Sequence, residues 1–222
     1  MTTGVDRMRV IVATIATALT VSAVASAQPP ASTMPASETK GFAEVVAQSA
    51  FGNVTSQSFG GEVGYTVRPN VQVFVDAGLV RDAAPTSLGT NALRIANGIA
   101  AVAGSADFHV KEPVTFGVVG VRLVVPTSYP NVLPYVEVGG GAAQVKRDVT
   151  FTTPSGDVTQ FVTLGTDLSG SDTNGMLSLG AGVAVPIGKS FLVDVGYRYG
   201  VVFTSGDRLN INRAGIGVGV RF

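Results

Sequence analysis

Apolar side chains recur at every second position in eight separate segments of the chain. The final segment shows this most clearly, because Ala214, Ile216, Val218, Val220 and Phe222 alternate with three glycines and one arginine. Successive side chains of a β-strand point to opposite faces, so a period of two predicts strands with one apolar face. The predicted strands are residues 42–51, 59–67, 71–81, 115–125, 134–145, 177–185, 191–203 and 214–222.

The connections between these segments alternate in length. Residues 68–70, 126–131 and 186–189 are short links that contain Pro, Gly or Asn, as tight turns require. The links on the other side are longer and comprise residues 52–57, 82–106, 149–173 and 204–210. Short turns at one end and longer loops at the other are typical of outer membrane barrels, in which the short turns are periplasmic.

One long loop contains a stretch with helical composition. In residues 91–103 the apolar side chains Leu93, Ile95, Ile99 and Val102 fall roughly on one side of a helix. We therefore expect a short helix in the second extracellular loop, where it would cap or enter the mouth of the barrel.

The face opposite the apolar one is mostly glycine with isolated charges. A face exposed to water would instead carry many Lys, Glu, Thr and Ser residues, and an eight-stranded barrel is just wide enough for side chains to fill it. Because buried charges are costly unless they are paired, we predict a charge network in the lumen. Its expected members are Glu44, Glu62, Asp76, Arg122, Glu137, Asp194, Arg198 and Arg221.

The composition favours a membrane protein. Charged residues make up 14% of the chain, whereas soluble domains carry about 25%. After the first 27 residues no segment offers the roughly 18 uncharged apolar residues of a transmembrane helix, and only closed barrels then span lipid. Phe191 and Phe203 would lie roughly 30 Å apart along the membrane normal, close to the height of an apolar band. An exported soluble sandwich or barrel is the alternative.

The first 27 residues have the features of a signal peptide. Arg7 and Arg9 precede the apolar residues 10–24, and Ala-Ser-Ala at 25–27 provides a cleavage site. An uncleaved membrane anchor is the alternative. We expect residues 28–40 to be a flexible periplasmic leader and residues 41–222 to be the barrel domain.

The sequence offers little for catalysis or for metal binding. It contains no cysteine, which excludes disulfides and thiol chemistry, and His109 is the sole histidine, which excludes a multi-histidine metal site. No serine pattern pairs with His109, so we expect no catalysis and no cofactor. The balance of 15 basic and 15 acidic residues gives no reason to expect nucleic acid as a partner.

These features together resemble the opacity-protein-like outer membrane barrels, which are related to the transmembrane domain of outer membrane protein A. The resemblance rests on the eight alternating segments, the strand PYVEVGGG at 134–141 and the ending GVGVRF at 217–222. It implies contact with outer membrane lipids and lipopolysaccharide. The sequence leaves the oligomeric state open, with a monomer favoured. The resemblance also implies that Val218, Val220 and Phe222 form a C-terminal signal for the barrel-assembly machinery.

Three functions are compatible with this interpretation. The first is a structural or surface-antigen role, in which the long loops are available for adhesion. The second is a narrow channel for small solutes, which would require an open lumen. A lipid-modifying barrel enzyme is the third, and the missing partner for His109 disfavours it.

Overall fold

The computed structural model describes residues 40–129, 131–165, 168–204 and 208–222. The predicted signal peptide and residues 28–39 of the predicted leader lie outside the described residues.

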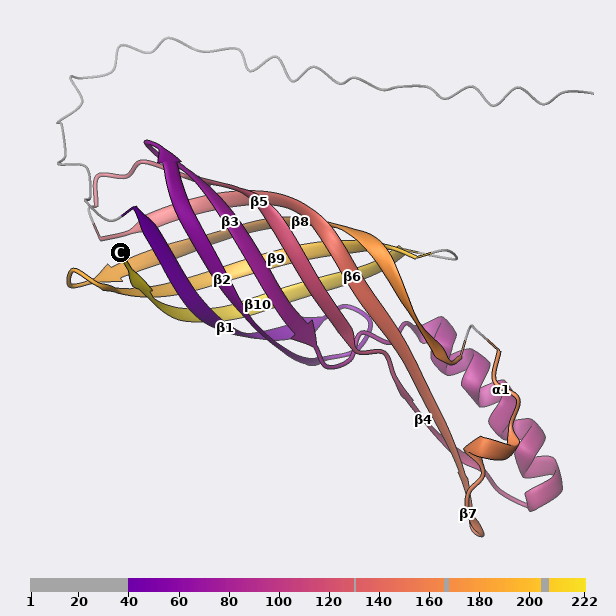
Figure 1. The fold of residues 1–222 in the computed structure, drawn as a ribbon. Helices are drawn as coiled ribbons and strands as arrows, with labels where there is room; N and C mark the ends of the chain where they lie inside the picture. The colour runs from indigo at the N-terminus through magenta and orange to yellow at the C-terminus, as the bar shows by residue number, and fades with distance from the viewer. Residues whose placement is uncertain (1–39, 130, 166–167, 205–207) are drawn as a thin grey trace, which may run out of the picture. The chain divides into compact units, whose positions relative to one another are not determined.

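Eight strands form a closed antiparallel ring (Figure 1). Each strand pairs with its neighbour in chain order, and the last strand pairs with the first from Phe42–Arg221 to Phe51–Asn212. This arrangement confirms the predicted eight-stranded up-and-down barrel. The strands are β1 (Gly41–Phe51), β2 (Ser56–Arg68), β3 (Val71–Val80), β5 (Val114–Val124), β6 (Leu133–Thr153), β8 (Gly170–Ile187), β9 (Phe191–Phe203) and β10 (Arg208–Arg221).

The short turns lie at the same end of the barrel as Lys40 and Phe222. Asn70 in the β2–β3 turn and Gly188 in the β8–β9 turn have φ angles of 64° and 63°. Asparagine and glycine are the residues that adopt this left-handed conformation most readily. Turn composition therefore explains why these connections are tight, as the sequence predicts.

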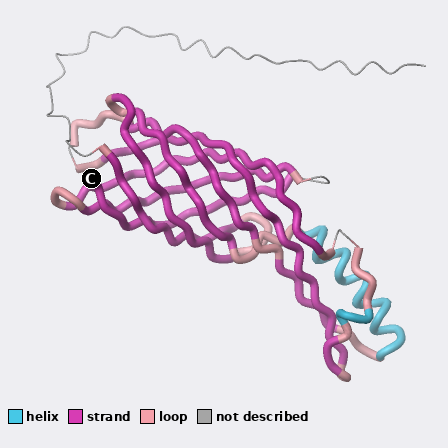
Figure 2. Tube along the Cα trace, viewed as in Figure 1, coloured by secondary structure: helices cyan, strands magenta, loops and turns pink. Residues whose placement is uncertain are grey.

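The opposite end of the barrel continues into an extension (Figures 1 and 2). Strand β6 runs on from Lys146 to Thr153 and pairs there with β4 (Asp107–Lys111) and β7 (Gly156–Asp157). We use "the extension" for α1 (Thr86–Ala103), β4, residues 146–153 of β6, β7, η1 (Thr159–Phe161) and the segments that join them. The prediction of one long loop over 149–173 is thus wrong, because Val149 and Phe151 continue the alternation of β6 into a second small sheet.

Helix α1 lies in this extension and not in the barrel mouth. It begins at Thr86, five residues before the predicted start, and ends before Gly104, whose φ of 84° terminates the helix. Its buried residues pack against the apolar row of β6 formed by Val149 and Phe151. The predicted helix is confirmed but its predicted position is wrong, since the sheet of the extension covers its apolar face. No helix among the described residues has both the length and the apolar character needed to cross a membrane.

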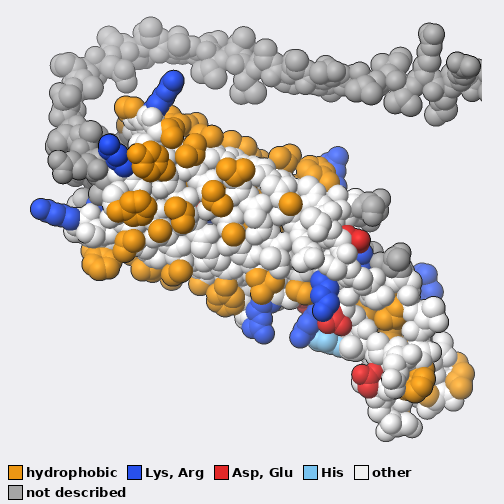
Figure 3. Space-filling model, in the orientation of Figure 1, with side chains coloured by type: hydrophobic (Ala, Val, Ile, Leu, Met, Phe, Trp, Pro, Cys, Tyr) orange, Lys and Arg blue, Asp and Glu red, His pale blue; other side chains and the backbone are white. Residues whose placement is uncertain are grey.

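Apolar side chains are spread over the face of the barrel that Figure 3 shows. Valines dominate this surface, with aromatic side chains toward the strand ends, such as Phe191, Tyr65 and Phe203. These side chains are exposed in the isolated molecule, as expected for a surface that contacts acyl chains.

The lumen is filled in layers. A large apolar cluster that includes Phe74, Phe116 and Met176 fills the end near the extension. A smaller cluster of Phe42, Tyr135, Ala184 and Leu192 fills the end near the short turns. The buried charged residues belong to the same inward-facing positions as these clusters, and they form the candidate site described next.

Candidate functional site

Two arginines and two glutamates form a ring across the lumen. Arg122 of β5 contacts Glu62 of β2 at 2.6 Å and Glu137 of β6 at 3.0 Å. Arg198 of β9 contacts the other oxygens of the same carboxylates, at 2.5 Å for Glu62 and 2.7 Å for Glu137. Each carboxylate therefore bridges both guanidinium groups. We call these four residues the lumen ring.

Aromatic side chains support the lumen ring on the side of the short turns. The Arg122 guanidinium lies 3.8 Å from the centre of the Tyr135 ring and 4.8 Å from that of Phe42. The Tyr135 hydroxyl donates a hydrogen bond of 2.8 Å to Asp194. Cation–π contacts stabilise a guanidinium that has been removed from water. Arg122 is therefore held in position by both charge and stacking.

A second ion pair lies toward the other end of the lumen. Arg213 of β10 contacts Asp76 of β3 at 3.4 Å, and its guanidinium lies 4.1 Å from the centre of the Phe116 ring. Arg213 is absent from the predicted network because the sequence pattern places residues 204–210 in a loop and begins the last strand at 214. Arg213 lies two residues before Gly215 and four before Gly217, so the period of two places all three on the inner face. This alternation could have identified Arg213 from the sequence.

Arg221 does not lie in the network, contrary to the prediction. Arg221 is at an inward-facing position of β10, but it is the last residue of the strand. Its guanidinium donates hydrogen bonds to the carbonyl oxygens of Gly188 and Lys189 in the β8–β9 turn. The end of a strand lies at the rim, where backbone carbonyls are closer than the lumen carboxylates. The structure brings the other seven predicted residues into the lumen.

Glu44 and Asp194 complete the buried charges of the lumen. The nearest cation to Glu44 is Arg198, at 3.8 Å, and one oxygen of Asp194 accepts the bond from Tyr135. Glycines on neighbouring strands provide the space for these groups, because a Cβ on Gly217 would lie 2.9 Å from the Glu44 carboxylate and one on Gly180 would lie 2.5 Å from that of Glu137. The glycine-rich inner face thus accommodates large charged side chains.

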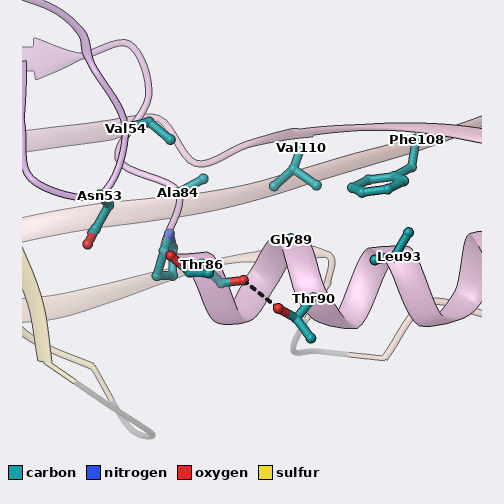
Figure 4. Close-up of a pocket in the computed structure, with 10 residues that line it drawn as sticks. Asn53, Val54, Ala84, Thr86, Gly89, Thr90, Leu93, Phe108 and Val110 are labelled. Carbon is teal, nitrogen blue, oxygen red and sulfur yellow. Dashed lines mark hydrogen bonds between the residues drawn. The ribbon is translucent and has the colours of Figure 1, made fainter.

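The extension presents a groove beside α1 (Figure 4). Its volume is about 350 Å³, and its walls come from the first turns of α1, from β4 and from the β1–β2 loop. Phe108 and Val110 of β4 face Gly89 and Leu93 of the helix in this view. The groove is mostly apolar, as binding surfaces for other macromolecules often are.

A buried carboxyl marks the junction between the extension and the barrel. Glu112 lies between β4 and β5, and one of its oxygens is 3.5 Å from the Arg147 guanidinium. Its backbone N–H donates to the carboxylate of Asp82. Burial raises the pKa of Glu112 to about 7, an effect that Arg147 opposes and Asp82 reinforces.

We expect the extension to become less stable as the pH rises from 5 to 8. The pKa of Glu112 is 4.5 in an unfolded chain and about 7 in the folded one, so the folded chain holds an extra proton between these values. The resulting stabilisation is complete below pH 4.5 and is lost as the pH rises through 7. Hydrogen exchange of the β4 amides, corrected for intrinsic rates, should show this slope. Glu112→Gln should flatten it, and an unchanged slope in that variant would contradict the assignment.

His109 lies in β4, opposite Thr150 of β6, with its side chain exposed. Neither this pairing nor any hydrogen bond identified in the described residues gives it a catalytic partner. The arrangement offers no support for the lipid-modifying enzyme.

Comparisons with known proteins agree with this geometry. A family model described as "Outer membrane protein beta-barrel domain" matches residues 13–222. A major outer membrane protein from Thermus thermophilus is similar in structure, with a TM-score of 0.50, 12% identity and coverage of 82% of this chain and 99% of that one. A search of curated proteins finds no match.

Two further solved structures are similar. The N-terminal β-barrel domain of Pseudomonas aeruginosa OprF gives a TM-score of 0.49 at 17% identity, covering 83% of this chain and 98% of that one. Neisserial surface protein A also gives 0.49, at 15% identity, covering 82% of this chain and 94% of that one.

Proposed function

The chain belongs to the family of outer membrane proteins with a β-barrel domain, and on that premise we propose that it is a non-conducting barrel that presents the extension for adhesion-like contacts at the cell surface. The family places it in the bacterial outer membrane. The observation that carries the proposal is the extension, which has a core of its own around Phe151, Val149 and Ala92, beyond the end of the barrel opposite the short turns.

Apolar side chains on the surface of the extension support a contact role. Val102 and Leu93 of α1 are 92% and 47% exposed, and Phe161 of η1 is 79% exposed. Exposed apolar side chains outside the lipid-facing wall favour contact with other macromolecules.

The proposal can be tested by adherence. Cells that display the full chain should adhere to protein-coated surfaces, and Leu93→Asp/Val102→Asp should reduce this adherence because it places charge on the contact surface. Arg68→Ala, at the end of β2 on the other side of the barrel, is the matched control and should leave adherence unchanged. Equal adherence of all three chains would refute the contact role.

The filled lumen leads us to expect no steady current in planar lipid bilayers. Arg122 and Arg198 are each 2% exposed, and apolar clusters fill the lumen on both sides of the lumen ring. A continuous column of water, which a channel needs, would have to displace these side chains. Single-channel recording on the folded chain checks this. Regular open events of uniform conductance would favour the alternative, a narrow channel for small solutes.

We further propose that the last strand carries the assembly signal. Val218, Val220 and Phe222 are exposed on the outer face of the folded barrel, which leaves them free to contact lipid or an assembly factor. Phe222→Ser should lower the yield of heat-modifiable barrel in cells while leaving refolding of the purified chain into detergent unchanged. Unchanged yield in cells would argue against this signal. The expected contacts with lipopolysaccharide rest on location alone.

A further inference from the structure

Strand β4 has an unpaired edge. Within the described residues its one neighbour in the sheet is β6. The backbone N–H and C=O of Glu112 point away from β6, toward Asp82 and Ala83 respectively. The C=O of Pro113 points toward β6 and accepts from Lys146.

This alternation fixes the direction of the remaining groups. Along an antiparallel strand, every second residue directs its N–H and C=O to the same side. Val110 and Phe108 lie two and four residues before Glu112. Their backbone N–H and C=O groups therefore point to the same side as those of Glu112, away from β6. An exposed edge of this kind is a template for the addition of another strand.

The side chains beside this edge favour an added strand with apolar residues. Phe108 and Val110 line the groove opposite Gly89 and Leu93 (Figure 4). A strand paired with β4 would direct its own alternate side chains into the same groove. The occupant should therefore have two apolar residues at alternate positions.

We propose that the occupant is β4 of a second copy of this chain, paired antiparallel about a twofold axis at His109. Phe108 of each copy then lies opposite Val110 of the other, which places their outward backbone groups in hydrogen-bonded pairs. On the exposed face, Asp107 of each copy lies opposite Lys111 of the other. Opposite charges directly across two strands stabilise the pairing, and a twofold axis uses each such contact twice.

This inference deepens the proposed contact function and rests on it for the accessibility of the extension. The sequence leaves the oligomeric state open and favours a monomer, because the free edge of β4 can be recognised only once β4 is known to pair with β6. Its test uses the purified full chain in detergent, so its outcome is independent of adherence and of conductance.

Charge exchange provides the main experiment. In sedimentation equilibrium we expect a concentration-dependent dimer of the wild type. Asp107→Lys or Lys111→Asp alone should weaken it about tenfold or more, because each sets like charges opposite one another at both ends. An equimolar mixture of the two variants should restore the dimer, since every lysine then faces an aspartate. The chain that carries both substitutions should also dimerise.

Two further variants test the position of the pairing. His109→Cys should form an interchain disulfide, because the central residues of the pair would have Cα atoms about 4.5 Å apart and the chain contains no other cysteine. Val102→Cys, exposed on α1, is the matched control and should not cross-link. Val110→Pro removes an outward donor and should abolish the dimer, whereas Val110→Thr should retain it.

Heat-modifiable migration on gels establishes that each variant is folded. The sedimentation experiment should span a range of about 100-fold in protein concentration, so that a weak dimer is also detected. A wild-type chain that stays monomeric over this whole range would overturn the inference. So would a mixture that dimerises no better than its components, or cross-linking through Val102→Cys equal to that through His109→Cys. If pairing fails while Leu93→Asp/Val102→Asp still reduces adherence, the occupant is another protein and only the self-pairing is overturned.

Discussion

Replacing Arg198 with alanine should destabilise the barrel by about 3–5 kcal/mol. The substitution would leave Glu62 with Arg122 as its remaining partner and would remove from Glu137 the cation that contacts its second oxygen. Burying a carboxylate without its partner costs far more than the pair contributed. Unfolding by urea in detergent, followed by the loss of heat-modifiable migration, should show a large shift of the midpoint.

Arg221→Ala is the matched control for this experiment. It also removes an arginine from an inward position of the barrel, but its guanidinium contacts turn carbonyls at 3.2 and 3.4 Å and no lumen carboxylate. Its cost should be about 1 kcal/mol or less, as for an ordinary hydrogen bond. Arg198→Met combined with Glu62→Gln should recover much of the loss, because Arg122 and Glu137 then remain as a neutral pair. A midpoint unchanged by Arg198→Ala would show that the lumen ring does not hold the barrel together.

Gly182→Ala should cost about 1–3 kcal/mol, the range for added atoms in a packed interior. A Cβ at this position would lie 2.5 Å from the Tyr135 hydroxyl oxygen and 2.7 Å from the backbone oxygen of Val195. Relief of this clash would shift the phenol that bonds Asp194 and stacks on Arg122. The urea midpoint and the near-ultraviolet circular dichroism of the tyrosines should both change.

Gly140→Ala tests the same substitution in a place with room. The nearest atom to a Cβ at Gly140 is Cδ2 of Leu177, at 3.7 Å, which is an ordinary van der Waals contact. Alanine also has less conformational freedom than glycine in the unfolded chain, so this substitution should be neutral or slightly stabilising. If both alanine variants unfold at the same urea concentration, close packing around Tyr135 is not what requires glycine at 182.

Period-two patterns predicted the barrel because one face of each strand contacts lipid and the other fills the lumen. The same pattern could not show where the strands end. Asn210 and Asn212 occupy outward positions of β10 and suggest a loop, yet they receive hydrogen bonds from Tyr199 and Tyr197 of β9. Cross-strand contacts of this kind extend a strand beyond its apolar part and depend on a neighbour that the local sequence does not specify.

The alternation of inward and outward positions predicts which charged residues face the lumen, but it does not predict which of them form pairs. Glu62 and Arg198 are 136 residues apart, and their contact depends on the stagger between β2 and β9, which are not neighbours in the ring. The location of α1 was unpredictable for a similar reason. Its apolar face covers a sheet that forms only when β4 pairs with residues 148–152 of β6.

The lumen ring joins β2, β5, β6 and β9. Its Arg122–Glu137 contact lies between the paired strands β5 and β6, whereas the contacts of Glu62 and Arg198 form only when the cylinder is complete. Before that moment, an inserted β2–β3 hairpin would present the Glu62 carboxylate, and an inserted β8–β9 hairpin the Arg198 guanidinium, to hydrocarbon without its partner in the ring, at a cost of several kcal/mol. Closure and neutralisation should therefore occur in one step, and half-built intermediates should remain outside the bilayer. The same coupling should slow the opening of the finished barrel, because none of these four strands can leave without separating an arginine from a glutamate.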